Sequence, residues 1–234
     1  MIDLSKLTAH RLQSAPYSWA EIDGLYAPED ARALADTYPH DHFKTVSGYG
    51  GAKDYEYEAR QLIAMGSHQV VNPHALSRQW LALTHSLCSL QYREAMSALT
   101  GLDLTQVPME ANVFHYGPGA NLGPHPDLAD KLVTHILYFN QSWNPAEGGC
   151  LQILGSAEAC DVLAQVVPVV GNSAILVRSD HSWHAVSRVV PGCRSSRRSV
   201  TVTFYRPGAT SSMWPADDKT PLHHYEKTAG GVVS

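Results

Sequence analysis

The sequence predicts a single α+β domain, with helices in the first half and mainly short β-strands in the second. Apolar residues recur at helical spacing between residues 75 and 99. After residue 105, short strand-like runs are separated by turn signals, a pattern typical of a β-sandwich or barrel. A length of 234 residues with 44% hydrophobic residues is enough for one domain with a sizeable core.

The first 105 residues predict a mainly helical layer that packs against the sheet. Proline fits the first turn of a helix and acidic residues suit its positive end, so Pro28-Glu29-Asp30 is expected to begin a helix that Pro39 ends. The apolar spacing over residues 75–99 predicts one long helix, or two helices broken near the middle. Gly101 stands where the C-cap of that helix belongs.

Residues 106–206 predict a core of short strands, and residues 207–234 predict a loop and tail. The predicted strands, including one short extended piece near the start of the chain, cover residues 19–25, 55–63, 109–116, 131–140, 151–154, 173–177, 184–190 and 199–205. Residues 40–53 hold three glycines and predict a mobile loop.

The composition argues against several classes of protein. The net charge is −5, which does not favour general binding to nucleic acids or membranes. The four cysteines lie far apart with no Cys-x-x-Cys pair, so we expect free thiols in a reducing cytosol and no zinc site. No apolar run approaches the roughly 20 residues that cross a bilayer, and the first residues lack the pattern of a signal peptide. We therefore expect a cytoplasmic protein.

Two histidines and one aspartate predict a metal site. Residues i and i+2 of an extended chain point the same way, so His125 and Asp127 can reach one ion from one strand end. His184, on a later predicted strand, can supply the third ligand. Such a 2-His-1-carboxylate set leaves one face of the ion open and is typical of non-haem Fe(II) oxygenases. Taken alone, His125 and Asp127 also fit a turn pair with a solvated histidine, and His181 is an alternative ligand.

Two predicted strands have one polar face and one apolar face. On the last strand one face carries Arg197, Ser199, Thr201 and Thr203. The other face carries Arg198, Val200, Val202 and Phe204. On the strand at residues 131–140 one face carries Thr134, Ile136 and Tyr138. The other face carries Val133, His135, Leu137 and Phe139. The apolar faces suit the helical layer. A polar face turned into the interior of a jelly roll indicates that a polar ligand binds there.

Over about residues 107–206 the sequence resembles the Fe(II)/2-oxoglutarate-dependent oxygenases, most closely their prolyl 4-hydroxylase-like branch. The order and spacing of many short elements carry the resemblance. They are Tyr116-Gly117-Pro118-Gly119, His125-Pro126-Asp127, residues 133–140 with Trp143, Gly148-Gly149 with Leu151, Pro168 with Gly171, His184-Ala185-Val186 and residues 197–201. The resemblance implies a double-stranded β-helix, or jelly roll, buttressed by the N-terminal helices.

The resemblance also implies the cofactors and the residues that bind them. His125, Asp127 and His184 would hold Fe(II), with O₂ and 2-oxoglutarate as cosubstrates. The planar fork of an arginine would pair with the distal carboxylate of 2-oxoglutarate. The residues expected around this cosubstrate are Arg197, Tyr138, Tyr116, Thr134 and Ser199, with Tyr116 near its iron-bound end.

The sequence departs from the family in the position of the arginine. The family usually places it nine or ten residues after the second histidine, which Arg194 fits, whereas Arg197 lies thirteen residues after His184. We assign the role to Arg197 because it begins the alternation that continues with Ser199 and Thr201. A slip of one residue would turn apolar side chains toward the dicarboxylate.

The implied reaction is hydroxylation of an unactivated C–H bond, with release of succinate and CO₂. The carboxylate of Asp127 favours hydroxylation over halogenation, since related halogenases carry a small residue in its place. The substrate can be a small molecule, an amino acid or a peptidyl residue, and Tyr55, Tyr57 and Arg60 are candidates to contact it or to form an edge strand. The alternatives are a cupin-like metal-dependent hydrolase or isomerase and a jelly roll that binds without catalysis.

Overall fold

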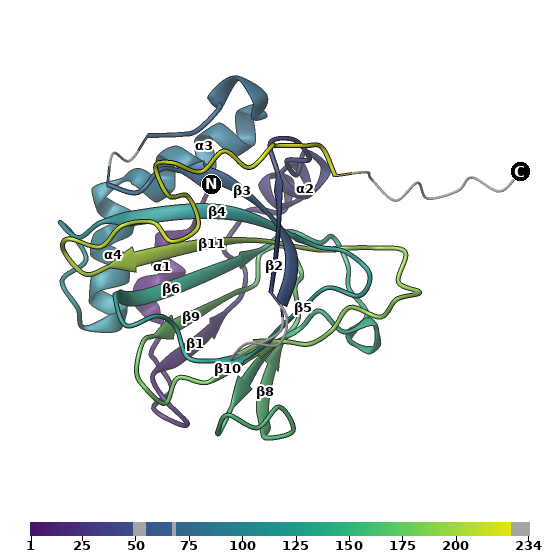
Figure 1. Ribbon diagram of the computed structural model, residues 1–234. Coiled ribbons are helices and arrows are strands. Elements are labelled where there is room, and N and C mark those ends of the chain that lie inside the picture. Colours follow the sequence, from purple (N-terminus) through teal and green to yellow (C-terminus); the bar gives the residue numbers. More distant parts are fainter. Residues whose placement is uncertain (49–54, 67–68, 226–234) are drawn as a thin grey trace, which may run out of the picture.

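Helices from the first half of the chain cover one face of a large antiparallel sheet (Figure 1). The computed structural model describes residues 1–48, 55–66 and 69–225. The helices are α1 (Leu4–Ala9), α2 (Pro28–Asp36), α3 (Arg78–Cys88) and α4 (Leu90–Thr100), with short 3₁₀ turns at Pro73–Ala75 and Pro145–Glu147. None of the helices within these ranges has the length and hydrophobicity that crossing a membrane requires.

The strands of the described residues form one sheet that curls into a nearly closed barrel, a jelly-roll double-stranded β-helix. They are β1 (Trp19–Ile22), β2 (Lys44–Gly48), β3 (Tyr55–Ile63), β4 (Met109–Tyr116), β5 (Asn121–His125), β6 (Lys131–Tyr138), β7 (Leu151–Leu154), β8 (Val162–Val166), β9 (Ser173–Val177), β10 (His184–Val186) and β11 (Arg197–Tyr205). Their order is β1-β9-β6-β11-β4-β3-β5-β10-β7-β8, and β2 pairs with β3. The predicted fold class is confirmed.

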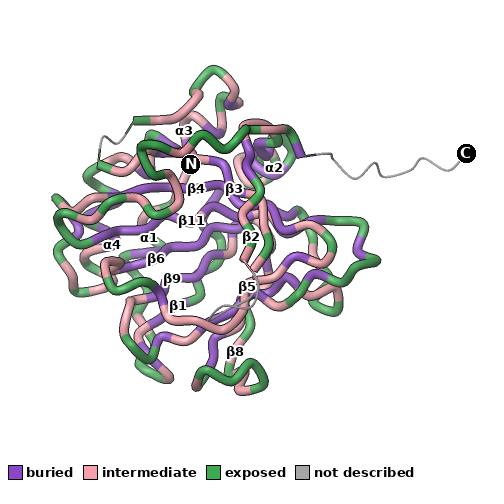
Figure 2. Tube along the Cα trace, viewed as in Figure 1, coloured by how far each residue is buried: buried purple, intermediate pink, exposed green. Residues whose placement is uncertain are grey.

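The two faces of β11 separate the hydrophobic core from the interior of the barrel. Val200, Val202 and Phe204 are fully buried in the main hydrophobic cluster, which includes side chains of α2, α3 and α4. Arg197 and Ser199 lie on the opposite face and line an internal cavity. Figure 2 shows the buried residues running along β4, β11, β6 and β9 under the helices. The alternation predicted for this strand is confirmed.

Strand β6 follows the same rule. The main cluster contains Val133 and Leu137 of this strand and Phe139, which follows its last residue. A second cluster inside the barrel contains Ile136 and Tyr138. The polar exception on the helical side is His135, which is buried with its Nδ1 2.9 Å from the hydroxyl of Tyr92 in α4. Burial lowers the pKa of His135 to about 3, so it is neutral within the core.

The helical run at residues 75–99 is two helices, the second of the two predicted forms. Ser89 has extended backbone, with φ −73° and ψ 149°, so it ends α3 and begins α4. Its hydroxyl accepts a hydrogen bond from the amide of Tyr92, which satisfies one free N–H of the new helix. Gly101 adopts a positive φ of 72° at the end of α4, as expected for a C-cap.

Other predicted boundaries need correction. Residues 44–48 of the expected loop form β2, because Thr45 and Val46 suit a strand and β3 offers its edge, and residues 49–53 of that loop lie outside the described part of the chain. The first 105 residues also contribute β1, β2 and β3 to the sheet, of which β2 was not predicted. Helix α1 and strands β5 and β8 were not predicted. The strand expected at residues 184–190 ends at Val186.

The C-terminal segment crosses the barrel opening and returns to the N-terminal half. The indole N–H of Trp214 donates to Asn112 Oδ1 at 2.7 Å, and Lys44 donates to the carbonyl of Met213 at 2.6 Å. Further on, His223 exchanges two backbone hydrogen bonds with Phe43. The tail expected at residues 207–234 is thus fixed to strands β2 and β4 at several points within residues 207–225.

The turn at Gly148 allows a mutational test of the fold. Gly148 has a φ of +72°, and a Cβ added there would lie 1.9 Å from the carbonyl oxygen of Arg188. Gly101 also has a φ of +72°, but no atom would lie within 4 Å of its added Cβ. Gly101→Ala should therefore lower the free energy of unfolding by roughly 1 kcal/mol. Gly148→Ala should lower it by about 2 kcal/mol more, because overpacking adds its own cost. Urea unfolding followed by circular dichroism measures both, and equal losses would contradict the clash.

Candidate active site

The three predicted metal ligands meet inside the barrel. His125 ends β5 and His184 begins β10, and these antiparallel neighbours place the two Cα atoms directly opposite each other. Asp127 follows two residues after His125, beyond the strand end. One ligand atom from each residue lies within 4.8 Å of the other two. The pairing of β5 with β10 brings together residues that the sequence separates by more than fifty positions.

Backbone hydrogen bonds orient both imidazole rings. The Nδ1 of His125 lies 2.8 Å from the carbonyl oxygen of Gly123, and the Nδ1 of His184 lies 2.9 Å from that of Ser182. A carbonyl oxygen only accepts, so the proton of each neutral ring is on Nδ1. This tautomer leaves the lone pair that a metal requires on Nε2.

Asp127 is buried and ionised. Lys131 donates to its Oδ1 at 2.7 Å, and the hydroxyl of Thr134 donates to its Oδ2 at 2.7 Å. Burial alone would raise the pKa of Asp127, but Lys131, His184 and the Thr134 hydrogen bond together hold it well below its usual range. A carboxylate fixed in this way is ready to bind a cation at neutral pH.

An internal cavity of about 130 Å³ connects the three ligands to Arg197. Arg197 is 2% exposed, and its Nη1 donates to the hydroxyl of Ser199 at 2.8 Å. Its guanidinium carbon lies 4.8 Å from the ring centroid of Tyr116 and 5.3 Å from that of Tyr138. The two aromatic rings and Ser199 thus hold a buried cation in the wall of the same cavity.

The cavity fits a dicarboxylate cosubstrate. The Nε of Arg197 and the hydroxyl of Tyr138 are both buried, and neither has a well-formed hydrogen bond within the described residues. Buried polar atoms are normally satisfied, so two adjacent unsatisfied donors indicate an absent acceptor. A carboxylate supplies two acceptor oxygens that match this pair. The donor set at the other end, two imidazoles and one carboxylate, suits Fe(II).

The other candidate arginines and histidines lie outside the cavity or the ligand cluster. Arg198 faces away from the cavity, 5.5 Å from the ring of Tyr38, and Arg194 is exposed in the turn before β11. His181 is exposed in the loop before β10 and is not part of the ligand cluster. His115 is buried against the ring of Tyr225.

The positions of the predicted cosubstrate residues differ in detail. Tyr116 lines the cavity and packs against Arg197. The hydroxyl proton of Thr134 is donated to Asp127, so this residue orients a metal ligand. Of the residues suggested to contact substrate, Tyr57 lines the cavity, whereas Arg60 is fully buried and donates to the backbone of Asp41.

An outer pocket of about 480 Å³ opens over the metal ligands and was not predicted as a whole. Its walls are β2, β3 and the C-terminal segment, and it shares His125, Asp127, Tyr57, Lys131 and Met213 with the inner cavity. Lys131 could have been suspected because it follows Asp127 by four residues at the start of a strand. Met213 had no such signal, since its position depends on the path of the C-terminal segment.

Comparisons with known proteins agree with this geometry. Residues 111–206 match the family model described as the 2OG-Fe(II) oxygenase superfamily. No curated protein sequence matches the chain. The matched region contains both histidines, the aspartate and Arg197.

Similar solved structures extend the likeness in fold to most of the chain. A prolyl-4-hydroxylase from Pseudomonas putida has a TM-score of 0.60 and 22% identity, covering 86% of this chain and 98% of that one. A prolyl hydroxylase from Trichoplax adhaerens, in complex with a hypoxia inducible factor peptide fragment, has a TM-score of 0.60 and 13% identity, covering 86% and 88%.

A third structure carries a different activity on the same fold. The non-heme alpha ketoglutarate dependent epimerase SnoN from nogalamycin biosynthesis has a TM-score of 0.50 and 14% identity, covering 94% of this chain and 93% of that one. Fold likeness at such identities does not identify a substrate. Residues 111–206 thus match the 2OG-Fe(II) oxygenase superfamily, a family that implies Fe(II), 2-oxoglutarate and O₂, and they contain the cluster of His125, Asp127 and His184 that could hold the metal.

Proposed function

We propose that this oxygenase hydroxylates an unactivated C–H bond of a small-molecule, amino-acid or peptidyl substrate, with release of succinate and CO₂. One observation carries the proposal. A single cavity joins a 2-His-1-carboxylate cluster to a buried arginine that has an unsatisfied donor. This pairing suits a cosubstrate with one end on the metal and the other on the arginine.

The protein's own residues would bind and orient the reactants. His125, Asp127 and His184 would hold Fe(II), and Arg197 with Tyr138 would hold the distal carboxylate of 2-oxoglutarate. Bound there, the metal supplies O₂ activation coupled to the oxidative loss of CO₂. Ser199 keeps the guanidinium of Arg197 in place through its hydroxyl. Ile136, Leu151 and Val186 line the cavity and limit the entry of water.

The ionised carboxylate of Asp127 supports hydroxylation over halogenation. It is buried and accepts hydrogen bonds on both oxygens, so its position beside the histidines is fixed and is not open to a halide. Desaturation and ring closure use the same site. The product distinguishes them, because hydroxylation adds one oxygen atom whereas the other two remove two hydrogens.

Removing one imidazole tests the metal site. His125→Ala and His184→Ala should each sharply weaken binding of one Fe(II) per chain and abolish turnover, because each removes one of the three ligands that the protein supplies. Anaerobic equilibrium dialysis followed by metal analysis measures the binding. His181→Ala is the matched control, since His181 lies outside the cluster. Full activity of either ligand variant in added Fe(II) would refute the assignment.

Substitution of each arginine tests the cosubstrate site. Removing one member of a buried charge pair costs roughly 3–5 kcal/mol, and each ~1.4 kcal/mol is tenfold in affinity. Arg197→Ala should therefore raise the apparent 2-oxoglutarate constant at least about a hundredfold. Arg194→Ala and Arg198→Ala, which lie in the turn and on the opposite face, should change it only a few-fold. A large effect of Arg194→Ala instead would assign the cosubstrate carboxylate to Arg194, three residues before Arg197.

Formation of succinate tests the proposed reaction. With Fe(II), O₂ and 2-oxoglutarate, the protein should release succinate slowly even before its substrate is identified, because the cavity can bind the cosubstrate by itself. Chromatography of the reaction mixture detects the product. No succinate should form under strict anaerobiosis or from Arg197→Ala at a low 2-oxoglutarate concentration. Oxygen uptake independent of 2-oxoglutarate would contradict the proposal.

A further inference from the structure

We propose, on the basis of the proposed function, that the primary substrate is a small organic anion whose carboxylate binds Lys131 and whose apolar or aromatic part occupies the outer pocket. Lys131 lies between the two cavities, since it lines both the inner one and the outer one. Its Nζ is 2.7 Å from Asp127 Oδ1, and its side chain is 19% exposed. The ammonium is thus beside the metal ligands and on the floor of the outer pocket.

The outer pocket has a second cation, but its charge is already neutralised. Lys44 forms an ion pair with Asp218 and donates to the carbonyl oxygen of Met213 at 2.6 Å. Its Nζ also lies 4.1 Å from the ring centroid of Trp214. These two hydrogen bonds and the aromatic contact fix the C-terminal segment to β2. Lys44 therefore builds the wall of the pocket.

Lys131 becomes an excess charge when the site is loaded. Asp127 is the partner found for its ammonium among the described residues, and the ammonium has three donors. In the loaded site, Asp127 also binds Fe(II), while Arg197 and 2-oxoglutarate add their own charges. Together with Lys131, these groups carry one more positive than negative charge. A half-buried cation without a full counter-charge favours an anionic ligand beside it.

The rest of the outer pocket suits an apolar group. Val46, Leu128, Met213 and the rings of Tyr55 and Tyr57 are prominent in its lining. The ring of Tyr57 packs against Phe114 and Tyr116, with centroids 5.3 Å and 5.2 Å away, so its position is set by the barrel. A volume of about 480 Å³ is in the usual range for small-molecule sites. A small acid with an apolar or aromatic body supplies both a free carboxylate and a group that suits these walls, whereas the backbone carboxyl group of a residue within a peptide chain is an amide.

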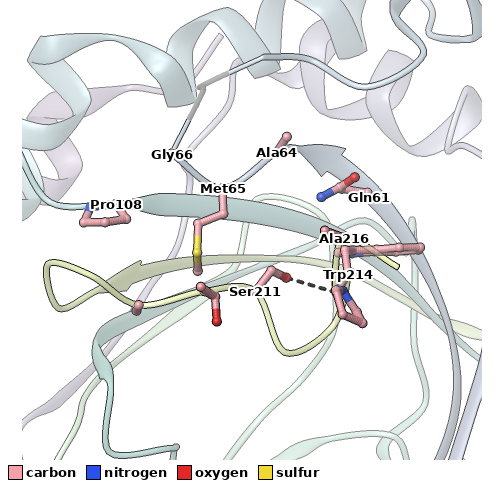
Figure 3. Close-up of a pocket in the computed structure, with 11 residues that line it drawn as sticks. Gln61, Ala64, Met65, Gly66, Pro108, Ser211, Trp214 and Ala216 are labelled. Atoms are coloured by element: carbon pink, nitrogen blue, oxygen red, sulfur yellow. Dashed lines mark hydrogen bonds between the residues drawn. The ribbon is translucent and has the colours of Figure 1, made fainter. Parts of the chain in front are cut away.

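Another hollow of the molecule lacks the charge for this role. It measures about 590 Å³ and lies beside the C-terminal segment (Figure 3). Its lining includes Gln61, Met65, Pro108 and Trp214. No lysine, arginine, aspartate or glutamate is among its lining residues within the described chain. The anion is therefore assigned to the pocket that contains Lys131.

Binding of matched acids and amides tests the proposal without turnover. The protein is loaded with Zn(II), a redox-inert ion, and 2-oxoglutarate. It is then titrated by calorimetry with phenylacetate, N-acetyl-L-phenylalanine and N-acetyl-L-leucine, and with the primary amide of each. At least one acid should bind about tenfold or more tightly than its amide, which corresponds to ~1.4 kcal/mol. Equal binding of every acid and its amide, or no binding of any acid at millimolar concentration, overturns the proposal.

Variants identify the group responsible. Lys131→Met should reduce the difference between acid and amide to within about twofold, and Lys131→Arg should keep it. Lys219→Met is the matched control, because Lys219 is an exposed lysine next to Asp218 and does not line the pocket. Zn(II) affinity is measured for each variant, since Lys131 contacts Asp127. If Lys131→Met does not bind zinc, the wild-type comparison and Lys131→Arg decide the result.

The possible failures can be told apart. A preference for acids that survives in Lys131→Met contradicts the assignment of Lys131. A rise in the 2-oxoglutarate constant of Lys131→Met, with the preference for acids unchanged, would instead assign Lys131 to the cosubstrate. Succinate release by the wild type without a preference for acids leaves the proposed function intact and removes the anion subsite. A preference for acids without succinate release supports the anion subsite and contradicts the proposed function.

Discussion

The alternation of side chains along β11 is the constraint on which the rest of the structure depends. One strand supplies Val200, Val202 and Phe204 to the core under the helices, and Arg197 and Ser199 to the cavity. Because the period of a strand is two, a slip of one residue would exchange these sets and turn Val200 and Val202 toward the cavity. The hydrophobic core and the proposed cosubstrate site are therefore specified by the same register, which the pairing with β4 and β6 fixes on both sides.

Buried polar groups inside the barrel are arranged from the metal ligands outward. The histidines are oriented by backbone carbonyls, and Asp127 is fixed by Thr134 and Lys131. A buried carboxylate without such partners would be protonated, because burial disfavours the charged form. Here the neighbouring donors outweigh burial and keep the ligand ionised. The cluster that could hold a metal is thus fixed by hydrogen bonds of the protein itself.

The sequence predicted those features that depend on local periodicity. The alternation in β6 and β11 placed Thr134, Tyr138 and Arg197 on the inner face, and the i, i+2 spacing placed His125 and Asp127 together. It did not predict the strand at residues 44–48, whose neighbouring glycines resemble a loop and whose stability comes from pairing with β3. Met213 was missed for a related reason. Its place in the pocket follows from contacts of Lys44 and Trp214 with distant residues, and no local pattern encodes those contacts.

The closing of the outer pocket by both halves of the chain has a consequence for the order in which the protein matures. Lys44 meets Asp218, 174 positions later, and Phe43 pairs with His223. A chain emerging from the ribosome exposes its N-terminal segments first and can fold them before synthesis ends. The His125, Asp127 and His184 cluster and the strands of the barrel all precede residue 213 in the chain, whereas one wall of the pocket beside them follows it. The outer pocket is therefore complete only after translation has passed Asp218, later than the cluster that it covers.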